Sequence, residues 1–244
     1  MRGGAEIDFE RLARRPARWD DALFWAMWFV VRALLRVLFR CRIEGEVPAF
    51  GDGYVLAANH ASFLDPLILG ASVRRRVIYL MAETVWRSAR VGWFYRWTRT
   101  IPLSARGGNR GALRAARQVL AQGRVIGIFP EGGLSRDGGL MLGSPGAVSL
   151  VLNEGKPIIP VGILGASRVL PSGKAWPRFG RIVVRFGKPI MPAEIEALGG
   201  DRRSRLRRAT RLIMQRIAEL TGQQAREDVL DEARAVARGA PPAR

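Results

Sequence analysis

The sequence predicts an α/β fold, a single domain with a mixed, largely parallel β-sheet flanked by helices. The first observation is that, from Gly51 onward, short runs rich in β-branched residues alternate with longer segments of helical periodicity. The second is that Gly123 and Gly155 each come just after a helical segment and just before a strand. A chain of 244 residues can bury one sizeable core, so we expect one domain and one active site.

Strands and helices are expected in alternation through the middle of the chain. The expected strands lie at 54–58, 77–81, 125–129, 158–163 and 182–186, and the expected helices at 66–72, 84–99, 110–122 and 147–154. Helical crossovers between strands favour parallel neighbours. A basic helix at 202–220 carries an apolar side, which we expect to pack on the domain rather than on a membrane or a nucleic acid.

The N-terminal segment has the pattern of an interfacial helix. Residues 22–31 form an uncharged apolar run of ten residues, followed by Arg32, Arg36 and Arg40. A bilayer-spanning helix needs about 20 apolar residues, and Asp20 and Asp21 do not fit the start of a secretory signal. The arginines share one helical face, which predicts an amphipathic, membrane-docking, monotopic helix. We therefore divide the chain into a membrane-interface helical segment (1–50), an α/β domain (51–200), a basic C-terminal helical segment (201–238) and a disordered tail (239–244).

The charge balance points to a polyanionic partner. Forty Lys and Arg residues face 21 Asp and Glu, a formal charge of +19, which attracts either a nucleic acid or an anionic membrane leaflet. Six of the seven tryptophans lie in the N-terminal helix region or at 84–99, near arginines, which is typical of a membrane interface, although the second group could instead belong to the core. The single cysteine, Cys41, and the single histidine, His60, exclude a disulfide framework and Cys-rich or His-cluster metal sites.

The first candidate motif, Asn59-His60-Ala61-Ser62-Phe63-Leu64-Asp65-Pro66, follows directly after an expected strand. Pro66 favours the first position of a helix and Asp65 its N-cap, so we expect a sharp turn that folds the carboxylate back towards the imidazole. Such a carboxylate would orient His60 as a general base for an attacking hydroxyl. Taken alone, this spacing also fits a capping aspartate and a histidine in a polar niche.

The second candidate motif, Phe129-Pro130-Glu131-Gly132-Gly133-Leu134-Ser135-Arg136, also follows an expected strand. Its glycines free backbone amides that can bind an anion, and Glu131 and Arg136 add a polar pair. Taken alone, it could equally be an acidic turn with solvated charges.

Together, these motifs resemble the glycerolipid acyltransferase family, typified by 1-acylglycerol-3-phosphate acyltransferase, over about residues 51–192. Asn59-His60 with Asp65 matches its NHxxxxD block, 129–132 the start of its FPEGTRS block, and 156–161 its VPIIPV block. Arg106, after Ile101-Pro102-Leu103, lies where the family carries an arginine that meets the acceptor phosphate.

The resemblance implies an acyltransferase of phospholipid biosynthesis. His60, aided by Asp65, would deprotonate the hydroxyl of a lysophospholipid, most directly 1-acyl-sn-glycerol-3-phosphate (lysophosphatidic acid), which attacks the thioester of acyl-CoA or acyl carrier protein with no covalent acyl-enzyme. No other cofactor and no metal is implied, and the expected location is the cytoplasmic face of the membrane. The residues expected to contact the acceptor are Asn59, Arg106, Glu131, Gly132, Gly133 and Arg136.

Two departures from the family pattern bear on the acceptor. Gly133 and Leu134 replace the Thr and Arg of FPEGTRS, and Pro145 lies in the block that often carries a lysine. Arg136 could compensate, or another lysophospholipid or acylated acceptor could be the substrate.

Two other classes of protein fit the sequence less well. A nucleic-acid-binding module would explain the charge but not the two strand-end motifs. A serine hydrolase would need a GxSxG nucleophile elbow, which the sequence lacks, so Ser62 is interpreted as a turn residue.

Overall fold

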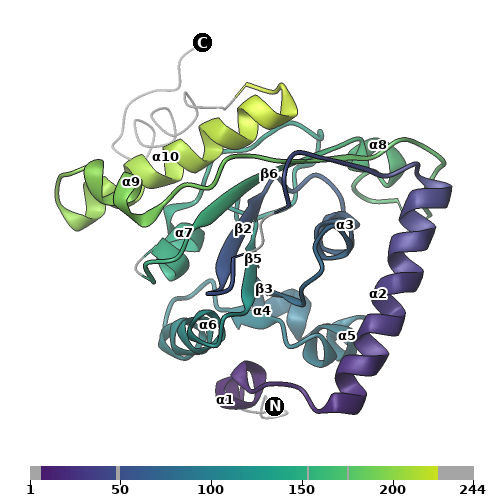
Figure 1. Ribbon diagram of the computed structural model, residues 1–244, viewed down its shortest axis with the longest axis horizontal. Coiled ribbons are helices and arrows are strands. Elements are labelled where there is room, and N and C mark those ends of the chain that lie inside the picture. The colour runs from purple at the N-terminus through teal and green to yellow at the C-terminus, as the bar shows by residue number, and fades with distance from the viewer. Residues whose placement is uncertain (1–6, 48–49, 153, 175, 225–244) are drawn as a thin grey trace.

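The computed structural model describes residues 7–47, 50–152, 154–174 and 176–224, which form a seven-stranded sheet with helices on both faces (Figure 1). The sheet has the order β1-β7-β6-β2-β5-β3-β4. Strands β6, β2, β5, β3 and β4 are parallel, β7 pairs antiparallel with β6, and β1 is parallel to β7. The strands are β1 (Arg42–Glu44), β2 (Tyr54–Ala58), β3 (Val77–Ala82), β4 (Ile101–Leu103), β5 (Val125–Ile128), β6 (Ile158–Leu164) and β7 (Val183–Phe186). The predicted mixed, largely parallel sheet is confirmed.

Two apolar layers hold the helices on the sheet. One layer joins α1, α6, α7, α9 and α10 to one face, and the other joins α2, α3 and α8 to the opposite face. The side chains of β2 alternate between the layers, as period-two geometry requires: Val55 enters the first layer, and Tyr54 and Leu56 enter the second. The helices are α1 (Phe9–Ala13), α2 (Arg18–Leu38), α3 (Asp65–Ser72), α4 (Glu83–Trp86), α5 (Gly92–Trp97), α6 (Arg110–Ala121), α7 (Pro145–Leu152), α8 (Ala166–Val169), α9 (Pro192–Ala197) and α10 (Arg202–Thr221).

The single helix expected at 84–99 is wrong. The chain instead forms the short helices α4 and α5, joined by residues 87–91. At Gly92, where α5 begins, a Cβ atom would collide with the carbonyl oxygen of Trp86, so the two helices approach more closely than a larger residue would allow. The three tryptophans of this segment therefore differ in exposure: Trp86 is buried, Trp93 is exposed and Trp97 is half-buried.

Helix α2 covers the apolar run expected to form the N-terminal interfacial helix, and it lies along one edge of the molecule with α3 between it and the sheet (Figure 1). Trp28, interpreted from the sequence as part of a lipid-facing cluster, is instead buried and donates a hydrogen bond from its indole Nε1 to the carbonyl oxygens of Gly70 and Val73. Arg32 also faces α3, donating to the carbonyl oxygen of Ala71. The opposite side of α2 exposes a row of large apolar side chains, which comprises Trp19, Leu23, Phe29, Val30, Leu34, Val37 and Leu38.

Within the described residues, no helix combines the length and apolar character needed to cross a bilayer. The described part of the C-terminal segment is α10, whose Ile213, Met214 and Ile217 are buried in the first apolar layer, as expected for packing on the domain. Residues 225–238 of that segment, together with the tail predicted at 239–244, lie outside the described residues.

Candidate active site

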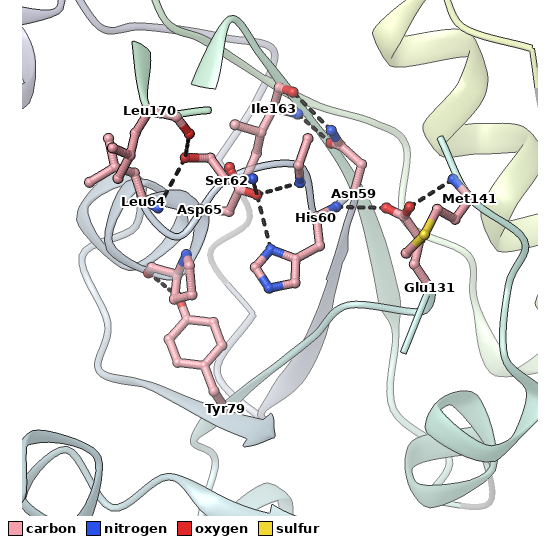
Figure 2. A network of polar contacts seen from close by, with 12 residues as sticks. Asn59, His60, Ser62, Leu64, Asp65, Tyr79, Glu131, Met141, Ile163 and Leu170 are labelled. Atoms are coloured by element: carbon pink, nitrogen blue, oxygen red, sulfur yellow. Dashed lines mark hydrogen bonds and ion pairs between the residues drawn. The ribbon is translucent and has the colours of Figure 1, made fainter. Parts of the chain in front are cut away.

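The two sequence motifs meet at one edge of the sheet. His60 follows β2 and Glu131 follows β5, and these neighbouring strands are parallel, so their carboxyl ends lie side by side. Ligands of open α/β sheets bind at this edge. Figure 2 shows the resulting network of contacts, in which the His60 turn and the Glu131 carboxylate approach each other.

A tight turn between β2 and α3 brings Asp65 back to His60. The carboxylate oxygen Oδ2 of Asp65 lies 3.0 Å from Nδ1 of His60 and accepts hydrogen bonds from the backbone N–H groups of Ala61 and Ser62, both at 2.7 Å. Asp65 is the first residue of α3 and Leu64 is its N-cap, so the expected N-cap role of Asp65 is wrong. The carboxylate stabilises the turn that precedes the helix.

Asp65 is fully buried, which shapes the electrostatics of the pair. Burial raises the pKa of the Asp65 carboxyl above its usual range, while the hydrogen bond and charge of His60 and the amides of Ser62 and Ala61 act in the opposite direction. Because a carboxylate accepts at Nδ1, that nitrogen carries the proton in the neutral ring, which leaves Nε2 as the basic atom. The His60 side chain is 18% exposed, so a substrate hydroxyl can approach it.

An aromatic stack fixes the plane of the imidazole. The Phe129 ring lies parallel to it with centroids 4.1 Å apart and an interplanar angle of 20°, and Tyr79 stacks on Phe129 at 6.0 Å. The Tyr79 hydroxyl donates to the carbonyl oxygen of Pro66 at 2.7 Å, which ties the stack to the start of α3. Tyr79 was not among the residues expected at the site, because it lies within β3 and belongs to no motif.

The second motif holds the backbone of His60 from both sides. Glu131 accepts the N–H of His60 on Oε1 at 2.6 Å and the N–H of Met141 on Oε2 at 2.7 Å (Figure 2). Ser135 donates its N–H to the His60 carbonyl oxygen at 2.8 Å. These contacts make Glu131 a residue that positions His60. Its contact with the acceptor stays a prediction.

The protonation of Glu131 should make stability depend on pH. Burial raises the pKa of Glu131 from 4.5 to about 7, against the opposing effect of its two amide contacts. Because the pKa of Glu131 is higher in the folded than in the unfolded protein, the protonated carboxyl stabilises the folded state. This stabilisation is complete below pH 4.5 and is lost as pH rises through about 7. At about 1.4 kcal/mol per pKa unit, the loss is of the order of 3 kcal/mol.

We therefore expect Glu131→Gln, which cannot ionise, to weaken this pH dependence. Denaturant unfolding at pH 5 and pH 8 should show a larger fall in the free energy of unfolding for the native protein than for the variant. Equal falls in both proteins would show that Glu131 does not titrate in this range.

The remaining predicted contact residues have different surroundings. Asn59 is buried, and its side-chain amide exchanges two hydrogen bonds with the backbone of Ile163, at 2.9 and 2.7 Å, which extends the pairing of β2 with β6. Gly132 adopts a positive φ of 73° that favours glycine, and the neighbouring Gly133 is exposed.

The two predicted arginines are both exposed to solvent. Arg106 follows β4 and is therefore separated from the Glu131 motif by β3, whereas Arg136 directly follows Ser135 within that motif. No three His, Cys, Asp or Glu side chains gather as a metal site would require, as far as the described residues show.

The chain is similar in sequence to known acyltransferases. Over 173 residues, the chain is 25% identical to a chloroplast 1-acyl-sn-glycerol-3-phosphate acyltransferase of Arabidopsis thaliana, covering 69% of this chain and 48% of that protein. Over 170 residues it is 25% identical to the 1-acyl-sn-glycerol-3-phosphate acyltransferase of Bacillus subtilis, covering 69% and 81%. The chain thus spans about half the length of the plant relatives.

The fold itself has a solved counterpart. The crystal structure of the 1-acyl-sn-glycerophosphate acyltransferase PlsC from Thermotoga maritima superposes with a TM-score of 0.65 at 20% identity, over 87% of this chain and 86% of that one. A sequence model described as Acyltransferase matches residues 39–164, which is just over half of the chain and includes both motifs of the site. The chain therefore belongs to the acyltransferase family.

Proposed function

We propose that this protein is an O-acyltransferase that moves a fatty acyl group from acyl-CoA or acyl carrier protein to the hydroxyl of a lysophospholipid. The proposed acceptor is 1-acyl-sn-glycerol-3-phosphate, the substrate for which its relatives are named, and the product is phosphatidic acid. The observation that carries the proposal is the His60 and Asp65 pair at 3.0 Å, held at the carboxyl end of β2 in a chain of this family.

The proposed reaction needs one base and no covalent enzyme intermediate. Nε2 of His60 takes the proton of the acceptor hydroxyl as its oxygen bonds to the thioester carbonyl carbon. The resulting tetrahedral intermediate collapses, its carbon–sulfur bond breaks, and the thiolate takes the proton from the imidazolium. The buried Asp65 carboxylate stabilises the imidazolium, and the stack on Phe129 holds the ring in place.

A small apolar pocket, lined in part by Tyr79 of the ring stack, supports a substrate with an apolar group. It lies between α2, α3, β3 and α5, and its lining includes Met27, Val31, Leu67, Val77, Tyr79 and Phe94. Tyr79 connects the pocket to the ring stack at His60. Its cavity volume of about 60 Å³ would hold only a few methylene groups of an alkyl chain, each of which favours binding by about 0.8 kcal/mol when it is removed from water.

The exposed row of α2 supports a location on a membrane. Phe29 is 65% and Val37 74% exposed, and a continuous apolar row of this kind is unusual on a soluble surface. With a formal charge of +19, the protein would be attracted to anionic lipid. We propose that α2 lies in the interface of the cytoplasmic leaflet and that the protein is monotopic.

Exposed arginines are the candidates for recognition of the acceptor head group. Arg106 is the cation that the family resemblance offers for a phosphate, and Arg136 is the candidate to compensate for Leu134, which occupies a position where the family carries arginine. We expect Leu134→Arg to raise kcat/KM for lysophosphatidic acid by about tenfold, because a charge-assisted hydrogen bond to phosphate contributes roughly 1.5–3 kcal/mol. For a lysophospholipid without a terminal phosphate, kcat/KM should not change. An equal rise in kcat/KM for both acceptors, or no rise for lysophosphatidic acid, would contradict a phosphate contact at position 134.

The test of the proposed function is acyl transfer in detergent, with labelled acyl-CoA and acyl carrier protein as alternative donors. A panel of lysophospholipids with different head groups serves as acceptors. Product formation from lysophosphatidic acid supports the full proposal. A preference for another head group would show that the acceptor is a different lysophospholipid, while the type of reaction stays as proposed. No transfer from either donor to any acceptor would overturn it.

A further inference from the structure

The connection between β6 and β7 carries two of the most exposed apolar side chains in the described residues. Trp176 is 83% exposed and Phe179 is 86% exposed. Four exposed cations accompany them, and residues 165–182 contain no Asp or Glu. The cations are Arg168, Lys174, Arg178 and Arg181. Large aromatic side chains at this level of exposure among cations fit a lipid interface, where rings enter the head-group region and cations meet phosphates.

The backbone around these side chains is held by specific contacts. Lys174 donates its N–H to the carbonyl oxygen of Pro171 at 3.1 Å, and Arg178 donates its N–H to that of the buried Val169 at 2.7 Å. A Cβ atom at Gly180 would lie 2.7 Å from a methyl group of Val169, so the returning chain packs tightly on α8. The two aromatic rings are therefore presented outward by a folded connection.

This connection lies beside the proposed membrane-facing helix. Ile182, directly after it, donates its N–H to the carbonyl oxygen of Phe39 at the end of α2, and Arg42 donates its N–H to that of Ile182, both at 3.0 Å. Figure 1 shows α8 next to the C-terminal end of α2. The exposed row of α2, which ends with Val37 and Leu38, thus continues towards the connection.

The same connection is attached to the catalytic turn. Ser62 donates its hydroxyl to the carbonyl oxygen of Leu170 at 2.9 Å, and this carbonyl directly precedes Pro171 (Figure 2). Phe63, the next residue of the turn, is 58% exposed. A membrane contact made here would act directly beside His60.

We propose that residues 171–174 and 176–181 form a second membrane anchor, in which Trp176 and Phe179 enter the interface of an anionic bilayer and Lys174, Arg178 and Arg181 contact head-group phosphates. The charge of the connection and its continuity with α2 favour a lipid surface as the occupant. The proposal rests on the proposed function in one respect, that the acceptor resides in a bilayer. Two anchors fix the orientation of the protein, so that the His60 turn lies at the level of the acceptor head groups.

The first test places a fluorophore on the connection. Cys41 is the only cysteine, so Trp176→Cys in a Cys41→Ser background takes one environment-sensitive label. Vesicles of phosphatidylcholine with phosphatidylglycerol should shift its emission to the blue, and lipids with quenchers in the acyl chains should quench it. Met191→Cys is the matched control, since Met191 is 44% exposed and is the N-cap of α9, a helix that lies away from α8 in Figure 1. Its label should not respond.

The second test measures binding to the same vesicles by co-sedimentation. We expect Trp176→Ser with Phe179→Ser to lower the partition coefficient by about tenfold or more, from the burial expected of two aromatic rings. Met191→Ser should leave it unchanged, and both variants should keep native acyl transfer to acceptors dispersed in detergent.

The outcomes separate this proposal from the proposed function. Native binding by the double variant, or an unresponsive label at 176 on vesicle-bound protein, would overturn the second anchor while leaving catalysis and docking by α2 intact. If the label at position 176 does not respond to vesicles and the protein instead forms concentration-dependent dimers without lipid, the surface binds a second copy of the chain. That result would also overturn the second anchor. A protein active in detergent that binds no vesicles would overturn both anchors but not acyl transfer.

Discussion

Replacement of His60 by alanine is expected to lower kcat for acyl transfer by about 10²- to 10⁴-fold, the usual contribution of a positioned general base. His60 is the only histidine of the chain, and its Nδ1 is engaged by Asp65, so its Nε2 is the atom available for the acceptor proton. KM should change little because the ring binds the reacting hydroxyl alone. Initial rates with labelled acyl-CoA and the best acceptor, over a range of acceptor concentrations, measure both quantities.

Ser62→Ala is the matched control for this variant, because it alters the same turn without touching the base. The Ser62 hydroxyl donates to the Leu170 carbonyl oxygen and accepts the N–H of Leu64, so its replacement should cost stability but leave most of the activity. Thermal unfolding of both variants separates loss of fold from loss of chemistry. Full activity of His60→Ala would show that His60 is not the general base. Loss of activity in a folded Ser62→Ala would instead indicate nucleophilic catalysis by Ser62.

The sequence predicted the central strands well because their apolar runs are unambiguous. All five residues of β2 are buried, as expected for a strand between two parallel neighbours. The strands at the two edges of the sheet, β1 and β4, have three residues each and gave no such run. The predicted helix at 84–99 was wrong because helical periodicity does not reveal the close approach of Gly92 to Trp86, which the turn at residues 87–91 creates.

The candidate site was predicted as a set of residues but not as a set of contacts. The spacing of His60 and Asp65 indicated a turn, and the structure contains it. The amide partners of Glu131 and the stack of Tyr79 on Phe129 depend on which strands become neighbours. Met141 contributes only its backbone N–H, which any residue except proline could offer, so no sequence pattern marks it.

Asp65→Asn is the variant that separates the charge of the pair from its geometry. Oδ2 of Asp65 accepts all three contacts, from His60, Ala61 and Ser62, while Oδ1 is buried without a hydrogen-bond partner among the described residues. An asparagine whose carbonyl oxygen takes the place of Oδ2 keeps the three hydrogen bonds and the same histidine tautomer. The negative charge beside the imidazole is lost, and the NH₂ group at the position of Oδ1 is buried without a hydrogen-bond acceptor among the described residues, which should lower stability somewhat.

We expect this variant to lower kcat by about 10²-fold or more, because an imidazolium must form in a buried setting without its counter-charge. Asp65→Ala is the comparison, since it also removes the three hydrogen bonds and should lower the unfolding temperature as well as the rate. Rates and thermal unfolding of both variants measure these effects. A native kcat in Asp65→Asn would mean that orientation of the ring suffices and that the buried charge serves the turn. A low kcat with native-like unfolding would instead assign the carboxylate a direct electrostatic role in proton transfer.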